Sequence, residues 1–405
     1  MKRTLILYIS LVFVLAGIHS LSAQNTLKIE EIEMVNLGDG QMYVHKRDAD
    51  KTAVDGKIRI ITGYTTEYID ANFKKGYAEG RWDYYRSNKL NAYMIYTNGY
   101  LNGECAELYP DGDQKETGNY KTGKKDGVWK QYYGEGKVKQ QEEYKDGEIR
   151  KITQYYPDGK LESERNFLNR KEHGAEKHYD RETGKLKTEK YYENGKQVGK
   201  QTQYISSNRN DYVQVSNYSK EGKLDGKFTE TYTETDKIKA QGQYKDGKKT
   251  GVWKYGKKDG EPTEEETYEA GDLRKVIKYY TDGSIESERS MLNGKKHGVE
   301  KQYDWESGRL KAEKNYENGK QVGRQMQYYT SSTNSYVQVS NYSKESKLDG
   351  KFTETYAETD KIKIQGQYNG GKKMGVWKYG YKNGNIYKEE KYEDGKLIET
   401  KKIEN

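Results

Sequence analysis

The sequence predicts an all-β protein, an elongated and largely single-layer antiparallel β-meander built from tandem β-hairpins of roughly 24 residues each. Three observations support this prediction. One short pattern recurs along the chain, glycine-containing turns punctuate it at regular intervals, and apolar residues alternate with polar ones between the turns. Because no helical segment separates the predicted strands, an antiparallel meander is favoured over a βαβ arrangement.

The recurring pattern is clearest around three tryptophans. The segment from Tyr120 to Tyr133 carries Trp129 near its centre, and closely similar segments surround Trp253 and Trp377. Successive copies begin 23 to 26 residues apart, a period typical of repeat architectures. Weaker copies begin at Tyr96, Tyr144, Phe167, Tyr192, Tyr218, Tyr268, Met291, Tyr316, Tyr342 and Tyr392.

A larger duplication overlies these repeats. The sequence YVQVSNYSK occurs at Tyr212–Lys220 and again at Tyr336–Lys344, 124 positions later, and other repeat starts show the same offset without gaps. A block of five hairpins has therefore been copied. The predicted organisation is a signal peptide over 1–23, an N-terminal capping segment with the first repeats over 24–143, a first block over 144–267, its duplicate over 268–391 and a C-terminal cap over 392–405.

Each repeat is expected to contain two strands and two turns. In the unit that begins at Tyr120, strands are expected over 127–133 and 137–144, with turns at 134–136 and 145–147. Asp-Gly and Asn-Gly pairs suit tight hairpin turns because these turns require positive φ. In the second strand of a later unit, Ile238, Ala240 and Tyr244 have the same parity, which predicts an apolar stripe on one face.

The composition of the 405-residue chain favours a thin, polar sheet. Charged residues make up 34%, and the chain has 41 Tyr, 43 Gly and only 3 Pro. An aromatic content of 13% argues against disorder, since disordered chains are poor in aromatics. The net charge is +8, but Lys and Glu alternate along the chain and form no basic cluster with interleaved aromatics. A nucleic-acid partner is therefore not expected.

The first residues have the features of a cleaved signal peptide. Lys2 and Arg3 precede a short apolar run over 5–18, and small residues lead to an expected cleavage after Ala23. No cysteine follows the run, so a lipid anchor is not predicted, and no transmembrane segment is expected after cleavage. The expected location is the periplasm, the cell surface or the medium. Cys105 is the single cysteine, which excludes an internal disulfide.

The pattern Y-x-x-G-x-x-x-G-x-W-x-x-Y, closing on a D/N-G-K turn, resembles the MORN-repeat variant family, whose bacterial members include antitoxin-like repeat proteins of the YwqK type. The resemblance extends from about Tyr43 to the end of the chain. It implies a meander of hairpins used for protein–protein or membrane-proximal contacts, without catalytic residues. Four units lack the tryptophan and carry Glu176, Gln201, Glu300 and Gln325 in its place.

Residues that could support catalysis or bind a metal are scattered. His45, His173, His178 and His297 show no metal-ligand spacing, and His173 and His297 are the same position in the two blocks. No nucleophile elbow, P-loop or dinucleotide fingerprint occurs. Glutamate runs such as 264–266 are interpreted as cross-strand partners of lysine. The sequence therefore predicts no catalytic residue, no metal site and no cofactor, so the protein is not expected to be an enzyme.

One set of aromatic residues remains as candidate contact positions. These residues occupy equivalent places in the first strands of their units, and two roles are open to them. On an exposed face they could stack on sugar rings or anchor a protein partner. On a covered face they would hold the thin sheet together, which is favoured because few other large apolar groups are available. The set is Trp82, Trp129, Trp253, Trp377, Phe228 and Phe352.

The functional hypothesis from sequence is an exported, non-catalytic repeat scaffold that mediates protein–protein interaction at the cell envelope. One alternative is a module that binds glycan or another envelope component through its Trp and Tyr positions. A second alternative, suggested by the resemblance, is an antitoxin-like partner of a toxin. Export is at odds with that alternative, because a cytoplasmic toxin would be out of reach.

Overall fold

A computed structural model describes residues 25–404 of the protein except 39 and 207–209. The expected signal peptide lies outside the described residues. The all-β prediction is confirmed, because the described elements are strands and two short 3-10 turns, η1 (Ile29–Glu31) and η2 (Gly134–Gly136). The chain divides into two compact units between Ser163 and Glu164, a boundary that falls inside the first predicted block.

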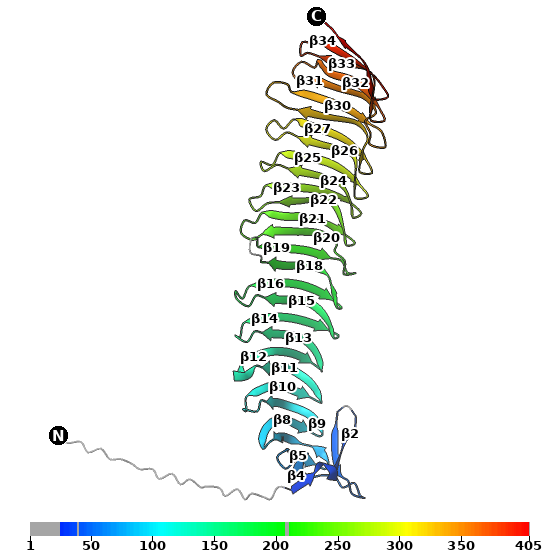
Figure 1. The fold of residues 1–405 in the computed structure, drawn as a ribbon. Helices are drawn as coiled ribbons and strands as arrows, with labels where there is room; N and C mark the ends of the chain where they lie inside the picture. The colour runs from blue at the N-terminus through cyan, green and yellow to red at the C-terminus, as the bar shows by residue number, and fades with distance from the viewer. Residues whose placement is uncertain (1–24, 39, 207–209, 405) are drawn as a thin grey trace, which may run out of the picture. The chain divides into compact units, whose positions relative to one another are not determined.

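Unit 1 is an open sheet in which β5 and all later strands pair antiparallel. After an N-terminal subregion, β7 to β13 follow one another as simple hairpins (Figure 1). Its strands are β1 (Asn25–Lys28), β2 (Ile32–Asn36), β3 (Met42–Lys46), β4 (Gly56–Ile61), β5 (Tyr68–Lys74), β6 (Tyr77–Ala78), β7 (Gly80–Arg86), β8 (Lys89–Thr97), β9 (Tyr100–Leu108), β10 (Gln114–Lys121), β11 (Lys124–Tyr132), β12 (Val138–Lys145) and β13 (Glu148–Tyr155). Strand β14 (Leu161–Leu168) contains the boundary between the units.

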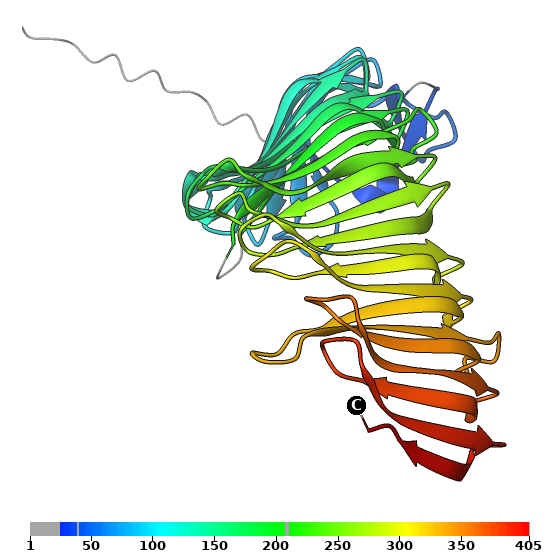
Figure 2. The ribbon, with the colours of Figure 1, turned by 90° about the horizontal axis from the view of Figure 1, so that it is seen from above.

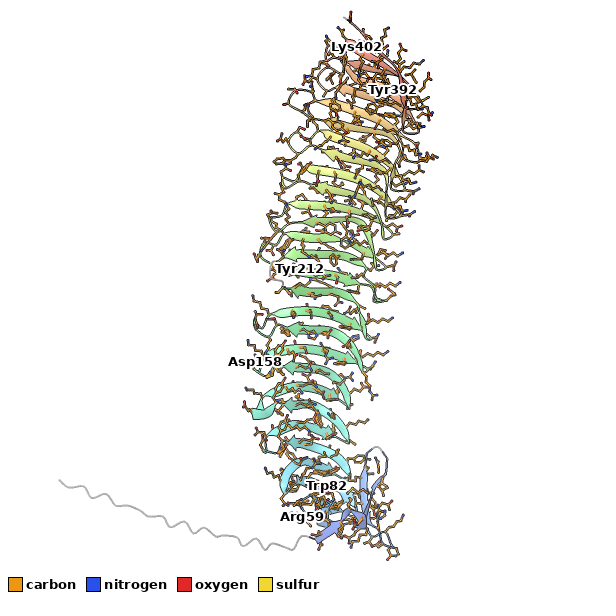
Figure 3. The ribbon with its side chains drawn as sticks, in the orientation of Figure 1. Arg59, Trp82, Asp158, Tyr212, Tyr392 and Lys402 are labelled. Carbon is orange, nitrogen blue, oxygen red and sulfur yellow. The ribbon has the colours of Figure 1, made fainter. Side chains whose placement is uncertain are left out.

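The N-terminal subregion departs from the meander. Strand β1 runs parallel to β4, because the β2–β3 hairpin lies between them in the chain. Aliphatic side chains, sparse elsewhere, gather here into a packed core around the fully buried Val44 and Ile60. Trp82, labelled in Figure 3, belongs to this core and lies against Phe73 and Tyr96.

Unit 2 is an antiparallel meander throughout. Figure 2 shows its yellow to red strands following one another in one layer, with turns along both edges. Its strands are β15 (Lys171–Tyr179), β16 (Leu186–Glu193), β17 (Lys196–Gln197), β18 (Gly199–Ile205), β19 (Tyr212–Tyr218), β20 (Gly226–Tyr232), β21 (Ile238–Lys245), β22 (Lys248–Gly256), β23 (Pro262–Glu269), β24 (Asp272–Tyr279), β25 (Ile285–Leu292), β26 (Lys295–Tyr303), β27 (Leu310–Glu317), β28 (Lys320–Gln321), β29 (Gly323–Tyr329), β30 (Tyr336–Tyr342), β31 (Gly350–Tyr356), β32 (Ile362–Asn369), β33 (Lys372–Gly380), β34 (Ile386–Glu393) and β35 (Lys396–Lys402).

The hairpin turns between repeats have the predicted backbone geometry. Asp146 and Gly147 have φ of 53° and 82°, and Asn318 and Gly319 have 51° and 86°. Positive φ at both central residues is the signature of the type I′ turn, whose twist matches that of the strands. The turn residues therefore set where each repeat ends.

The first strand of a repeat begins earlier than the sequence suggested. The expected strand began at residue 127, whereas β11 begins at Lys124, which pairs with Lys121 across a two-residue turn. Gly127 lies inside the strand with φ of 71°, and the β10–β11 register shifts between Thr117 and Asn119. The strand thus continues through a β-bulge, which a glycine accommodates.

None of the helical turns within the described ranges has the length or the apolar character that a membrane-spanning helix requires.

Candidate functional site

Within each unit, the candidate aromatic residues lie on one face of the sheet, here called the inner face; the opposite face is called the outer face. They belong to a line of cross-strand neighbours, called the central row, that crosses the middle of the strands. In unit 1 the central row is Trp82, Met94, Cys105, Gly118, Trp129, Glu142 and Ile152. In unit 2 it includes Gln201, Phe228, Gly242, Trp253, Glu266, Val276, Arg289, Glu300, Gln325, Phe352, Gly366, Trp377 and Glu390.

The structure places all six candidates in buried positions. The exposed fractions are 1% for Trp82, 4% for Trp129, 2% for Trp253 and 1% for Trp377. Phe228 and Phe352 are each 7% exposed. Rings this enclosed offer no face to a sugar or to a partner protein, so their geometry is that of packing groups.

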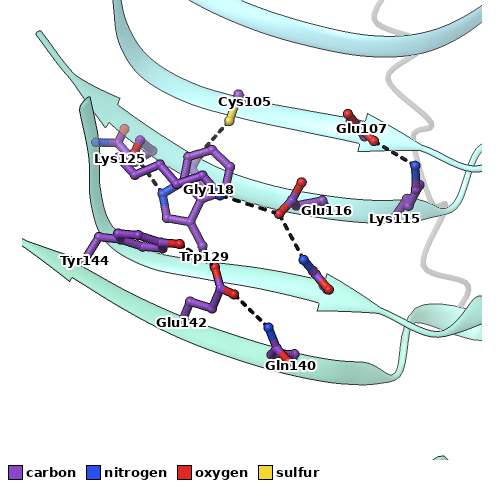
Figure 4. A network of polar contacts seen from close by, with 12 residues as sticks. Cys105, Glu107, Lys115, Glu116, Gly118, Lys125, Trp129, Gln140, Glu142 and Tyr144 are labelled. Carbon is purple, nitrogen blue, oxygen red and sulfur yellow. Dashed lines mark hydrogen bonds and ion pairs between the residues drawn. The ribbon is translucent and has the colours of Figure 1, made fainter. Parts of the chain in front are cut away.

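A single-layer sheet buries these tryptophans by enclosing each ring within its own repeat. The ring of Trp129 lies against the backbone of Gly118 on the preceding strand, where a Cβ would overlap the indole (Figure 4). Lys125 Nζ lies over the same ring, 3.8 Å from its centroid. Tyr120 packs edge-on at 4.9 Å, and Tyr144 flanks the ring at 6.4 Å.

The same enclosure recurs in unit 2. Trp253 lies on Gly242 beneath Lys249, whose Nζ is 4.3 Å from the ring centroid. Trp377 lies on Gly366 beneath Lys373, at 4.2 Å. A cation over an aromatic face is attracted to the ring, and here it also covers the ring from solvent. The bottom glycine and the covering lysine were not recognised from the sequence, although both recur at the same 124-residue interval as the tryptophans.

Three of the enclosed tryptophans, Trp129, Trp253 and Trp377, each face a glutamate on the next strand. Glu266 accepts hydrogen bonds from the hydroxyls of Tyr255 at 2.6 Å and Tyr268 at 2.9 Å. Burial and the bonded carboxylate raise the pKa of Tyr268 to about 12, so its hydroxyl stays a donor. In the last copy, Glu390 accepts from Tyr379 at 2.7 Å, Tyr392 at 2.9 Å and Lys388 at 2.9 Å.

Four of the units without tryptophan fill the same place with polar side chains. Gln201 accepts from the backbone N–H of Tyr191 at 2.9 Å and donates to the carbonyl oxygen of Val198 at 2.7 Å. Gln325 makes the equivalent bonds: its side chain accepts from the backbone N–H of Asn315 and donates to the carbonyl oxygens of Asn315 and Val322. Glu300 pairs with Lys296 at 2.6 Å, and Glu176 contacts His178 at 3.1 Å. These residues therefore act as hydrogen-bonded substitutes for an aromatic ring.

The inner face carries no arrangement suited to metal binding or thiol chemistry. No group of three or more His, Cys, Asp or Glu side chains is placed to hold a metal ion within residues 25–404, leaving aside the undescribed positions 39 and 207–209. Burial raises the pKa of Cys105 to about 11, which keeps its thiol protonated near neutral pH. The central row is thus an array of packing clusters and internal ion pairs.

Together these observations define an open β-hairpin repeat protein in which Trp129, Trp253 and Trp377 are each enclosed by neighbouring strands. The family model described as MORN repeat variant matches residues 125–146 and 151–169, which include Trp129 and its glutamate partner Glu142. No curated protein matches the chain.

Solved structures of toxin complexes overlap the chain over most of its length. The crystal structure of TcdB2–TccC3 is 11% identical over 81% of this chain, with a TM-score of 0.15. The Photorhabdus luminescens Tc holotoxin pore is 12% identical over 88% of this chain, also with a TM-score of 0.15. The chain spans 18% of the length of each of these structures. Overlap at such a TM-score supports no functional comparison.

The carboxylate of Glu390 should make the last hairpins sensitive to acid. The hydrogen bond from Tyr379, then the one from Lys388, lowers its pKa from 4.5 to about 2. The folded-state pKa is thus below the unfolded value, so the stabilisation is complete above about pH 4.5 and is lost as the pH falls toward about 2.

We expect Glu390→Gln to be less stable than the wild type at about pH 6 and to lose most of that difference at about pH 2.5. Urea unfolding followed by hydrogen exchange in β33–β35 measures this. Glu389→Gln is the matched control, because Glu389 lies on the outer face and makes a longer ion pair, 3.5 Å, with Lys378. A stability difference for Glu390→Gln that is constant from about pH 6 to about pH 2.5 would contradict the assignment.

Proposed function

We propose that the protein is an exported, non-catalytic repeat scaffold that binds a partner protein at the cell envelope. The observation that carries the proposal is a repeated apolar position on the outer face. Val128, Val252 and Val376 directly precede the enclosed tryptophans, so they point to the opposite face. They are 46%, 48% and 49% exposed.

The surroundings of these valines resemble a small protein-binding patch. The cross-strand neighbours are Glu143 for Val128, Thr267 for Val252 and Lys391 for Val376. The ion pair between Lys254 and Glu265, at 3.3 Å, lies beside Val252. An apolar centre with a polar and charged rim is the usual anatomy of a protein interface. The match to MORN repeats, which are generally protein-binding modules, supports the same class of function.

The alternative of glycan binding has one specific observation in its favour. Trp305 lies in the turn after β26, is 56% exposed, and its side chain adds to the hydrogen bonds from Ser284 that lower the pKa of the Asp282 carboxyl. An exposed indole is a suitable platform for a sugar ring. The alternative therefore depends on Trp305 and no longer on the six candidates of the central row.

The scaffold proposal is tested by site-specific photo-crosslinking in cells. A photoreactive amino acid at position 252, on the outer face, should give a discrete crosslinked protein that is lost in Val128→Glu/Val376→Glu. The same amino acid at position 255, where the half-buried Tyr255 lies on the inner face, is the control and should give none. Crosslinking from position 255 but not from 252 would contradict the proposed face. Trp305→Ala with retained crosslinking would separate protein binding from sugar binding.

Export is tested independently of the partner. We expect the protein recovered from the cell envelope or the medium to begin near Gln24, because the run before Ala23 has the form of a cleaved leader. N-terminal sequencing or mass spectrometry measures this. A mature chain that keeps Met1 in the cytoplasm would overturn the export proposal and restore the antitoxin-like alternative.

A further inference from the structure

Strands β27 and β29 of unit 2 separate toward one edge of the sheet. Their register contains only two pairs, Ala312 with Gln327 and Glu313 with Met326. Beyond these pairs β27 still pairs with β26 as far as Leu310, and β29 still pairs with β30 as far as Tyr329. Both strands therefore remain extended after the hydrogen-bonded ladder between them has ended. Beyond Ala312 and Gln327, the backbone N–H and C=O groups of β27 and β29 that face one another are not paired with each other.

A cleft of about 640 Å³ lies at this separation. Its walls are the turn over 304–309, the turn over 330–335 and the beginning of the turn over 357–361. Met326 and Tyr328 alternate with the inner residues Gln325 and Gln327, so they lie on the outer face and line the cleft there. Tyr328 is 39% exposed, which leaves part of its ring open to a ligand.

The walls of the cleft are held in place before any ligand binds. Lys382 Nζ donates to the carbonyl oxygen of Thr333 at 2.7 Å and contacts Glu358 at 3.2 Å, which ties the middle turn to the last one. Ala357 N–H donates to the carbonyl oxygen of Ser335 at 2.9 Å. On the opposite wall Asp304 accepts from the backbone N–H and hydroxyl of Ser307 at 3.0 and 2.8 Å. Ordered walls reduce the entropy that binding costs.

The charges that line the cleft favour an anionic ligand. Its two carboxylates are engaged, Asp304 by Ser307 and Glu358 by Lys382. Its two cations, Arg309 and Lys311, are exposed. The hydrogen bonds from Ser307 and, to a smaller extent, the charge of Lys311 lower the pKa of the Asp304 carboxyl. Opposite charge on a ligand would be attracted to these two exposed cations.

We propose that this cleft binds a short extended segment of a partner protein that carries acidic side chains around an apolar one. The segment would hydrogen-bond to the separated strands as an added β-strand, place its apolar side chain against Met326 and Tyr328, and direct its carboxylates toward Arg309 and Lys311. A floor that contains a flexible methionine suits an aliphatic or aromatic side chain of a peptide better than a flat sugar ring. This assignment rests on the proposed protein-binding function and names the chemistry of its partner.

The first block provides a matched control. Its strands β16 and β18 also share two pairs, Thr188 with Gln203 and Glu189 with Thr202. Thr202, however, stands where Met326 stands in the second block, 124 positions later. The apolar floor is therefore a feature of the second block, and substitutions of Tyr204, the counterpart of Tyr328, should leave peptide binding unchanged.

Binding is measured by fluorescence anisotropy on the full mature chain. The probes are labelled acetyl-Glu-Leu-Glu-Phe-Glu-amide, its counterpart with lysine in place of each glutamate, a version with N-methylated backbone amides, and a chitin hexasaccharide. The acidic peptide should bind at least about tenfold more tightly than the lysine peptide. N-methylation should weaken it, because it removes the main-chain donors. Tyr328→Ser should weaken it by about tenfold, whereas Tyr204→Ser should not.

The charge-reversal variant Arg309→Glu/Lys311→Glu keeps the proposal testable even if other variants fold poorly. It should reverse the preference, so that the lysine peptide binds and the acidic peptide does not. Equal binding of both peptides, preferential binding of the hexasaccharide, or an unchanged preference in the reversed variant would overturn the proposal. If the crosslinks from position 252 persist in the reversed variant, the scaffold stands and the cleft is not its partner site. If the acidic peptide binds but no protein is crosslinked from position 252, the scaffold proposal is contradicted and the peptide-binding cleft is supported.

Discussion

Replacing Trp253 with alanine should lower the free energy of unfolding of the surrounding hairpins by about 3–5 kcal/mol. The ring is 2% exposed and packs with Phe228 and Ala240 in a buried cluster flanked by Tyr244 and Tyr268. A single-layer sheet has no second layer of side chains that could move into the vacated space. The cavity would therefore remain open to solvent, and the neighbouring aromatic residues would lose their common contact.

The effect of Trp253→Ala should be local. Repeats are coupled mainly to their nearest neighbours, so hydrogen exchange should accelerate in β20–β23 and stay unchanged in unit 1. Val252→Ala is the matched control, because Val252 is adjacent in sequence, lies on the outer face and is 48% exposed. Unchanged exchange in β20–β23 combined with lost partner binding would show that Trp253 contacts a ligand and would refute the packing role.

Gly242→Ala should destabilise the same hairpins by about 1–3 kcal/mol or more, because the added methyl group would overlap the indole of Trp253. The backbone of Gly242 is outside the positive-φ region, so alanine would cause no conformational strain there. In a strand without such a neighbour, a glycine-to-alanine substitution would stabilise the folded protein by about 0.4–1 kcal/mol, because alanine lowers the conformational entropy of the unfolded chain. Whether Gly242→Ala destabilises or stabilises the protein therefore shows whether the indole of Trp253 lies directly against the backbone of Gly242.

A double-mutant cycle isolates this contact. Gly242→Ala combined with Trp253→Leu should be less destabilised than the sum of the single variants, since the smaller side chain makes room for the methyl group. Urea unfolding of the four proteins gives the coupling energy. Gly118→Ala and Gly366→Ala should repeat the result, because each of these glycines also lies beneath a tryptophan. A stabilising Gly242→Ala, or additive effects in the cycle, would contradict the enclosure of the ring.

Much of the fold could be predicted because its information is local. The turn pairs such as Asp146-Gly147 adopt the expected geometry, and the recurrence of Trp129, Trp253 and Trp377 marks equivalent strands. The exact strand starts could not be predicted, because Gly127 looked like the beginning of a strand and instead forms a bulge within one. Glycine occurs in turns, bulges and close contacts alike, so its spacing alone does not distinguish them.

The candidate site was predictable only in part. The sequence singled out the aromatic positions, but it treated Lys125, Lys249 and Lys373 as ordinary surface charges. In the structure these lysines cover the rings, and Glu142, Glu266 and Glu390 are fixed by tyrosine hydroxyls. The cleft between β27 and β29 had no sequence signal, because it arises where a ladder of hydrogen bonds ends.

The sequence by itself determined the all-β class, the hairpin period and the duplicated block, because turn chemistry and the alternation of side chains along a strand act over a few residues. Only the tertiary structure decided which side of each aromatic ring is covered, which charges are paired and where two strands part. Those properties depend on contacts across neighbouring strands: Trp253 is enclosed because Gly242 on the preceding strand has no side chain and Lys249 folds back over the ring.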